Sequence, residues 1–169
     1  MPTLGSPPVT KSGKFFCLGK IIVNAPGQNF LKSFSAAALE VAKFNAKKFG
    51  VDDRINFFCG NLLEPLAGKK FDAIISNPPY IPTADLKNLQ AEVKTEPVTA
   101  LDGGADGLNF YRQIISASPE FLNCGGFLAV EIGSTQAEDV KKIFAENNFS
   151  DIEIFQDLAG LDRVIAGVI

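Results

Sequence analysis

From residue 35 onward, the hydrophobic positions of the chain alternate between the helical period and short apolar runs. Helices are predicted to begin at Ser35, near Tyr111 and after Thr135, and strands are predicted at 55–59, 71–76, 127–132, 152–156 and 164–168. A continuous apolar run such as 71–76 is typical of a parallel sheet with helices on both faces. The last two strands are joined by a turn around Gly160, so they are expected to be antiparallel neighbours. The pattern predicts an open α/β sheet whose last strand is reversed.

Two of the predicted helices carry local signals for where they begin. Ser35 is a good N-cap for a helix that runs through Phe49, with Gly50 just past its end. Thr135 and Glu138 have the spacing of a capping box for another helix. The buried faces are expected to hold Ala38, Val41, Ala42 and Phe49 in the first helix and Ala137, Val140 and Phe144 in the second.

The first 34 residues differ in composition from the rest of the chain. They contain four lysines and no acidic residue, and the first acidic residue of the chain is Glu40. Residues 1–34 therefore carry a charge of +4. Because the whole chain has a net charge of −3, residues 35–169 carry −7. We therefore expect residues 1–34 to be an atypical segment, either disordered or outside the natural reading frame, and residues 35–169 to form the functional domain.

The composition also excludes several kinds of site. The chain has no histidine, so Ser-His or Cys-His nucleophile pairs and His-ligated metals are excluded. Its three cysteines lie far apart without a C-x-x-C pair, so neither a disulfide framework nor a metal site is expected. The acidic balance predicts no direct binding of nucleic acid. No apolar run is long enough to span a bilayer, and we expect a cytoplasmic protein without a membrane partner.

The predicted strand at 71–76 is followed by a motif with its own chemistry, Asn77-Pro78-Pro79-Tyr80. Ligands bind at this edge of open α/β sheets. The prolines fix the backbone and offer carbonyl acceptors, so the side-chain oxygen of Asn77 and the carbonyl of Pro78 can each accept one N–H of a planar NH₂ group. The ring of Tyr80 can stack on that group. The motif therefore predicts a site for an amino or amide nitrogen, against the plainer interpretation of a turn that ends a strand.

Several stretches of residues 35–169 resemble one family of enzymes. They are 37–42, 45–46, 77–82, 96–97, 100–104, 106–108, 111–112, 131–133 with Gln136, and 162–164. In them the chain resembles the HemK/PrmC protein-(glutamine-N5) methyltransferases, a family of class I S-adenosylmethionine-dependent enzymes. Asn-Pro-Pro-Tyr alone is shared with adenine-N6 DNA methyltransferases, and the stretch from Glu96 to Leu108 points to glutamine. Glu96 and Glu131 are expected either to shape the pocket or to take part in catalysis.

The resemblance implies a Rossmann-like open sheet of the class I methyltransferase type. It implies methyl transfer from S-adenosylmethionine to the side-chain amide of a glutamine in a peptide chain release factor. The catalytic residues that it implies are Asn77, Pro78, Pro79 and Tyr80. The cofactor-binding residues that it implies are Asn61, Leu62 and again Asn77, and many members have Asp at the position of Asn61.

The chain departs from this family where the cofactor should bind. The family has a glycine-rich turn after its first strand and a ribose-binding carboxylate after its second. Residues 9–19 offer only Gly13 as a loop glycine, and the carboxylate position falls at Ser33, between Lys32 and Phe34. The first strand and the glycine loop are therefore expected to be degraded or missing. The family's separate N-terminal helical domain, which helps to seat the release factor, is also expected to be absent.

Three functions stay open at this stage. The first is the methyl transfer that the resemblance implies. The second is a cofactor-deficient remnant or binding module that keeps the sheet and the pocket at residues 77–80. The third is an amino methyltransferase that acts on a nucleic acid base, which the charge of −7 over residues 35–169 disfavours.

Overall fold

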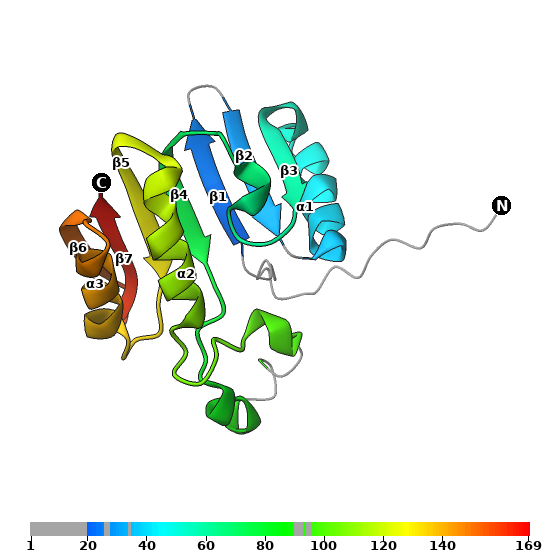
Figure 1. The fold of residues 1–169 in the computed structure, drawn as a ribbon. Coiled ribbons are helices and arrows are strands. Elements are labelled where there is room, and N and C mark those ends of the chain that lie inside the picture. Colours follow the sequence, from blue (N-terminus) through cyan, green and yellow to red (C-terminus); the bar gives the residue numbers. More distant parts are fainter. Residues whose placement is uncertain (1–19, 26–27, 34, 90–92, 94–95) are drawn as a thin grey trace.

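A computed structural model describes residues 20–25, 28–33, 35–89, 93 and 96–169 of the chain. Seven strands form one open sheet in the order β3-β2-β1-β4-β5-β7-β6 (Figure 1). The strands are β1 (Lys20–Ala25), β2 (Gln28–Ser33), β3 (Ile55–Cys59), β4 (Phe71–Asn77), β5 (Leu122–Glu131), β6 (Ser150–Gln156) and β7 (Asp162–Val168). The helices are α1 (Ala36–Lys48), α2 (Asn109–Ala117) and α3 (Ala137–Glu146), and short 3-10 helices cover Asp52–Arg54, Glu64–Leu66, Thr83–Asn88, Val98–Ala100 and Ser118–Glu120.

The directions of the strands match most of the prediction. β2 is parallel to β3, and β4 is parallel to β5. β7 is antiparallel to both of its neighbours, β5 and β6, which confirms the reversed strand at the end of the chain. The predicted open α/β sheet is therefore confirmed.

The strand β1 is also reversed, and the sequence pattern did not predict this. It is antiparallel to β2 on one side and to β4 on the other. Only residues 26 and 27 separate β1 from β2, so the two strands are adjacent in both sequence and sheet, without the crossover that parallel strands need. The carboxyl end of β1, at Ala25, consequently lies at the opposite edge of the sheet from the carboxyl ends of β2, β4 and β5. The first strand of the family pattern was expected before residues 9–19, which lie outside the described residues.

Residues 20–25 and 28–33 thus belong to the same sheet as the strands that follow residue 35. The remaining residues of the acid-free segment, 1–19, 26–27 and 34, lie outside the described residues. The position expected for the glycine loop, residues 9–19, is among them. No helix within the described ranges is both long enough and apolar enough to cross a membrane.

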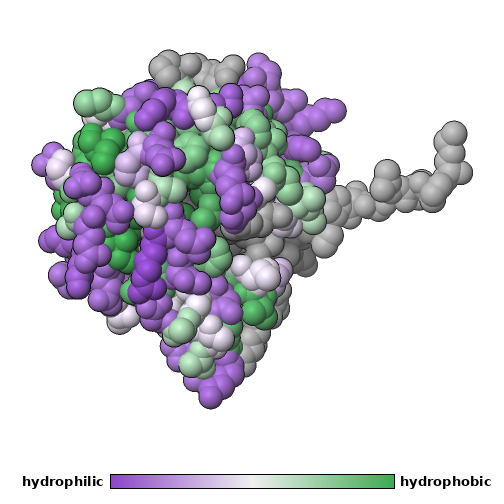
Figure 2. All heavy atoms as spheres, in the orientation of Figure 1, coloured by the Kyte–Doolittle hydropathy of each residue, from purple (hydrophilic) through white to green (hydrophobic). Residues whose placement is uncertain are grey.

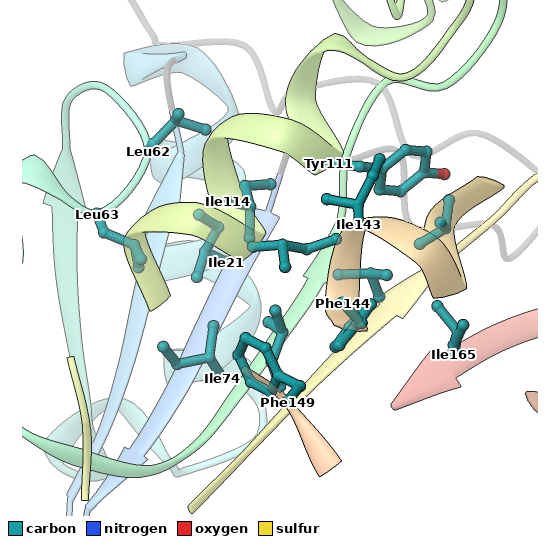
Figure 3. Close-up of a cluster of buried hydrophobic side chains, with 14 of the residues drawn as sticks. Ile21, Leu62, Leu63, Ile74, Tyr111, Ile114, Ile143, Phe144, Phe149 and Ile165 are labelled. Carbon is teal, nitrogen blue, oxygen red and sulfur yellow. The ribbon is translucent and has the colours of Figure 1, made fainter. Parts of the chain in front are cut away.

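The core lies between one face of the sheet and the helices α2 and α3 (Figure 3). Ile21, Ile74 and Ile165 come from three different strands, and Ile114 of α2 and Phe144 of α3 pack in the same cluster. All five side chains are at most 1% exposed. The crossovers to β3 and to β5 lead in opposite directions along the sheet, so right-handed connections put α1 and α2 on opposite faces.

The buried face of α1 was predicted wrongly. Its buried residues are Leu39 and Ala46, whereas Val41 and Phe49 are 45% and 66% exposed. The helix packs on β2 and on the edge strand β3. These two strands cover only a narrow face of the helix, on which Leu39 and Ala46 lie two turns apart. The expected positions Ala38 and Ala42 are half-buried.

The two predicted helix starts had different outcomes. The hydroxyl oxygen of Ser35 accepts a hydrogen bond from the backbone N–H of Ala38 at 3.2 Å, which confirms this N-cap. The capping box of Thr135 and Glu138 was wrong, because α3 begins one residue later than that spacing requires and Gln136 is its N-cap residue. The predicted buried face of α3 is confirmed, with Ile143 as a further member.

Candidate active site

The predicted motif at residues 77–80, which we call the acceptor loop, leaves the carboxyl end of β4. Asn77 is the last residue of β4 and is exposed. Pro78 and Pro79 are buried, and Tyr80 is half-buried. Two successive prolines fix two φ angles and remove two N–H donors, so this loop is stiff and its carbonyl groups must be satisfied by other segments.

A second loop, residues 101–107, holds the chain that continues from the acceptor loop, and we call it the clamp loop. The N–H of Ile81 donates to the carbonyl of Leu101 at 2.9 Å, and the N–H of Gly103 donates back to the carbonyl of Ile81 at 2.8 Å. The hydroxyl of Thr83 donates to the carboxylate of Asp102 at 2.7 Å. The stretch between the two loops projects beyond the edge of the sheet, and its tip is hydrophilic (Figures 1 and 2). The chain is therefore anchored immediately after the acceptor loop.

Two glycines allow the clamp loop to approach the acceptor loop closely. A Cβ atom at Gly103 would lie 2.8 Å from the Cα atom of Tyr80. A Cβ atom at Gly107, where φ is +76°, would collide with the carbonyl oxygen of Tyr80 and lie 2.7 Å from Nε2 of Gln136. Both contacts involve groups that are held in place, so only glycine fits at these positions. This packing accounts for two glycines of the stretch that resembles the methyltransferase family.

The ring of Tyr80 reaches towards the end of the neighbouring strand β5. Its hydroxyl donates to Oε1 of Glu131, the last residue of β5, at 3.4 Å. Burial and the negative charge of Glu131 raise the pKa of Tyr80 above its ordinary value of 10.0. Burial likewise raises the pKa of Glu131, while the positive charge of Arg163 opposes that rise. Arg163 is itself held by Asp157, at 3.0 and 3.2 Å.

The residues expected on the cofactor side lie farther along the same edge. Asn61 and Leu62 follow β3, which is separated from β4 by β2 and β1, or by about 14 Å at the usual strand spacing. Asn61 is exposed, and its side-chain NH₂ group donates to Glu64 at 2.8 Å. Leu62 is buried and has a positive φ of 35°. No hydrogen bond in the described part of the chain joins these two residues to the acceptor loop.

The end of β2 does not fit a ribose. A class I methyltransferase was expected to need a carboxylate there, and the strand ends on Lys32 and Ser33, both fully buried. Burial lowers the pKa of Lys32 from 10.5 to about 8, and the nearby Cys59 and Glu64 oppose this effect. The neighbouring strand β1 runs in reverse, so no turn follows its carboxyl end at this edge. The described residues therefore fit an NH₂ acceptor better than they fit S-adenosylmethionine.

Sequence reasoning gave no role to Gln136, although the residue lies within a stretch of the family resemblance. The structure brings it into contact with both the acceptor loop and the clamp loop. Of the two glutamates that were singled out, Glu131 lies beside Tyr80, and Glu96 is half-buried within the projecting stretch. In the described ranges, no three Cys, Asp or Glu side chains gather closely enough to hold a metal ion.

Known proteins that resemble this chain in sequence are methyltransferases. The family model described as "Methyltransferase small domain" matches residues 21–101. A release factor glutamine methyltransferase of Geobacter sulfurreducens is 52% identical over 134 residues, which are 79% of this chain and 46% of that protein. Its counterpart from Moorella thermoacetica is 45% identical over 135 residues, 79% of this chain and 48% of that protein. Over these residues, the chain is homologous to the release factor glutamine methyltransferases. It spans about half the length of the curated relatives that it matches.

A solved structure supports the methyltransferase fold independently of close sequence similarity. The crystal structure of a methyltransferase from Pyrococcus furiosus matches with a TM-score of 0.60 at 14% identity, over 81% of this chain and 60% of that one. This likeness concerns the fold alone. The methyltransferase domain and the homologues imply S-adenosylmethionine as the methyl donor, although the end of β2 lacks the expected carboxylate.

Proposed function

We propose that this methyltransferase homologue transfers a methyl group to the side-chain amide nitrogen of a glutamine, in a peptide chain release factor. The names of its relatives supply the substrate class. The proposal depends on the acceptor loop. This loop is stiff, it lies at the carboxyl end of β4, where ligands bind in open α/β sheets, and its Asn77 is exposed. Residues 35–169 hold all the side chains that the proposal needs for the acceptor, and a cytoplasmic location goes with this substrate.

In this proposal, the acceptor loop orients the glutamine amide. The side-chain oxygen of Asn77 and the carbonyl of Pro78 each accept one N–H of the amide, while the ring of Tyr80 lies against its plane. An amide nitrogen is a poor nucleophile because its lone pair is delocalised, so the rate comes from positioning and fixed acceptors. S-adenosylmethionine would supply an electrophilic methyl group, and Asn61, Leu62 and Asn77 are the residues proposed to contact it.

Two measurements test this function. Calorimetric titration with S-adenosylmethionine reports whether the chain binds the donor, and transfer of a labelled methyl group to a release factor reports turnover. Asn77→Ala should lower transfer by more than about 100-fold, because one preorganised acceptor is lost, and should change donor affinity only modestly. Asn56→Ala, at an exposed asparagine of β3, is the matched control and should behave like the wild type. Transfer at the wild-type rate by Asn77→Ala would show that the acceptor loop is not the site.

A second candidate is a binding module that retains the acceptor loop without turnover. The reversed β1 and the buried Lys32 at the end of β2 favour it, since both alter the donor side of the edge. Three results together would support this function over catalysis. A release factor binds the wild-type chain, Asn77→Ala weakens that binding, and no methyl group is transferred.

A further inference from the structure

Gln136 connects three segments of the site that are far apart in the sequence. Its Nε2 donates to the carbonyl of Tyr80 at 3.0 Å and to the carbonyl of Gly107 at 3.4 Å. Its Oε1 accepts from the N–H of Gly133 at 3.0 Å and lies 3.4 Å from the hydroxyl of Tyr111, whose single proton is shared with the nearer carbonyl of Glu131 at 2.9 Å. The residue is only 8% exposed, so these partners take the place of water.

Both N–H donors of the side chain are used, and its oxygen accepts from Gly133 and contacts the Tyr111 hydroxyl. A carboxamide has two N–H donors and an oxygen with two acceptor sites. Both donors serve carbonyl groups of irregular loops, which no strand or helix ladder would satisfy. A buried carbonyl that loses its partner carries a desolvation penalty, and a loop can avoid that penalty by moving out towards water. The position of the acceptor loop therefore depends on the donors of Gln136.

Tyr80 is held at both ends by this arrangement. Its carbonyl is bound by Gln136, and its hydroxyl reaches Glu131. Gln136 is in turn fixed from the other side by Gly133, just after β5, and by Tyr111 of α2. A contact that begins at the N-terminus of α3 thus sets the direction of the loop that would receive the substrate.

We propose that Gln136 is the positioning residue of the acceptor loop: its NH₂ group locks the carbonyl of Tyr80 against the clamp loop and so fixes the Tyr80 ring for the acceptor amide. The catalytic part of this inference rests on the proposed function. The structural part does not, because it concerns contacts within the chain.

The test uses the two tyrosines of the chain, Tyr80 and Tyr111, and the absence of tryptophan. The ultraviolet absorbance of tyrosinate reports these two side chains alone, and Tyr111 is fully buried with a pKa raised far above the ordinary value, so Tyr80 ionises first. Gln136→Met removes both donors at similar volume. We expect it to move the first tyrosine ionisation down towards 10.0, because a released ring is no longer buried beside Glu131. Gln113→Met, at an exposed glutamine of α2, is the matched control.

A pair of glycine variants tests the same lock from the other side. Gly107→Ala would push a methyl group between Nε2 of Gln136 and the carbonyl of Tyr80, whereas Gly125→Ala has nearly the same φ, +77° against +76°, and faces open space. We expect Gly107→Ala to shift the first ionisation as Gln136→Met does and Gly125→Ala to leave it unchanged. If Gln136→Met does not fold, Gln136→Leu takes its place, since it also removes both donors and adds no charge beside Tyr80.

Folded variants at Gln136 and Gly107 whose tyrosine titration matches the wild type would overturn the inference. In the transfer assay, Gln136→Met should lower kcat at least about tenfold with an unchanged KM for the donor, as expected when only the acceptor is misplaced. Should the wild type transfer no methyl group, the proposed function fails while the titration still decides the role of Gln136. A fall in thermal stability without any change in titration would mark a purely structural residue and would also refute the inference.

Discussion

The buried Lys32 predicts an unusual dependence of stability on pH. The residue is 0% exposed, and burial lowers its pKa from 10.5 to about 8. In the unfolded chain the ammonium group is hydrated and regains its ordinary pKa. Between pH 8 and pH 10.5, the unfolded chain therefore binds more protons at this position than the folded one does.

The sign and size of the effect follow from this difference in bound protons. Stability rises with pH wherever the unfolded state binds more protons, so Lys32 opposes folding fully below pH 8 and ceases to oppose it above pH 10.5. A fall in pKa from 10.5 to about 8 corresponds to about 3 kcal/mol. That is a large fraction of the free energy of unfolding of a typical domain.

Lys32→Met isolates this contribution, because methionine has a similar length and no charge. Unfolding by guanidinium chloride is measured for the wild type and the variant at pH 7 and at pH 10.5. We expect the stability of the variant relative to the wild type to fall by about 3 kcal/mol between the two pH values. Other titrating groups occur in both proteins and cancel in the difference. Lys141→Met, at an exposed lysine of α3, should show no such change. A constant difference between Lys32→Met and the wild type would refute the reasoning.

Two further predictions concern the edges of the fold. Ser35→Ala should lower the free energy of unfolding by about 1 kcal/mol, because the N–H of Ala38 loses its cap, and Ser134→Ala at an exposed serine is the control for chemical denaturation. Asp106 should remain ionised down to about pH 2, since hydrogen bonds from Arg112 and from the N–H of Leu108 lower its pKa. A side-chain carboxyl signal of Asp106 that titrates near pH 3.8 in nuclear magnetic resonance would contradict this expectation.

Much of the sheet was predictable because its signals are local. The apolar run of β4 and the N-cap at Ser35 depend on neighbouring residues, and both were confirmed. The reversed β1 was missed, although Pro26-Gly27 is a turn signal between two short stretches of residues with strand propensity. The expected family pattern, in which a glycine-rich turn follows the first strand, favoured a different arrangement.

The site was predictable only in part for the same reason. The acceptor loop is a contiguous motif, so its place at the end of a strand could be inferred from sequence. Gln136 binds Tyr80 and Gly107, which are 56 and 29 positions away in the sequence. Its partners there are backbone carbonyl groups, and a pattern of side chains cannot indicate such bonds. The requirement for glycine at residue 107 likewise arises from a backbone contact between distant segments.

The hairpin of β1 and β2 also bears on how this sheet assembles. Strands that are separated by two residues can pair with little loss of chain entropy, on the microsecond timescale that is typical of hairpins. Strands that are far apart in the sequence pair slowly, because the chain between them must first close into a loop. The interior of this sheet contains its most local pair, β1 with β2, so this hairpin can form first and serve as the template on which β4 and then β5 are added.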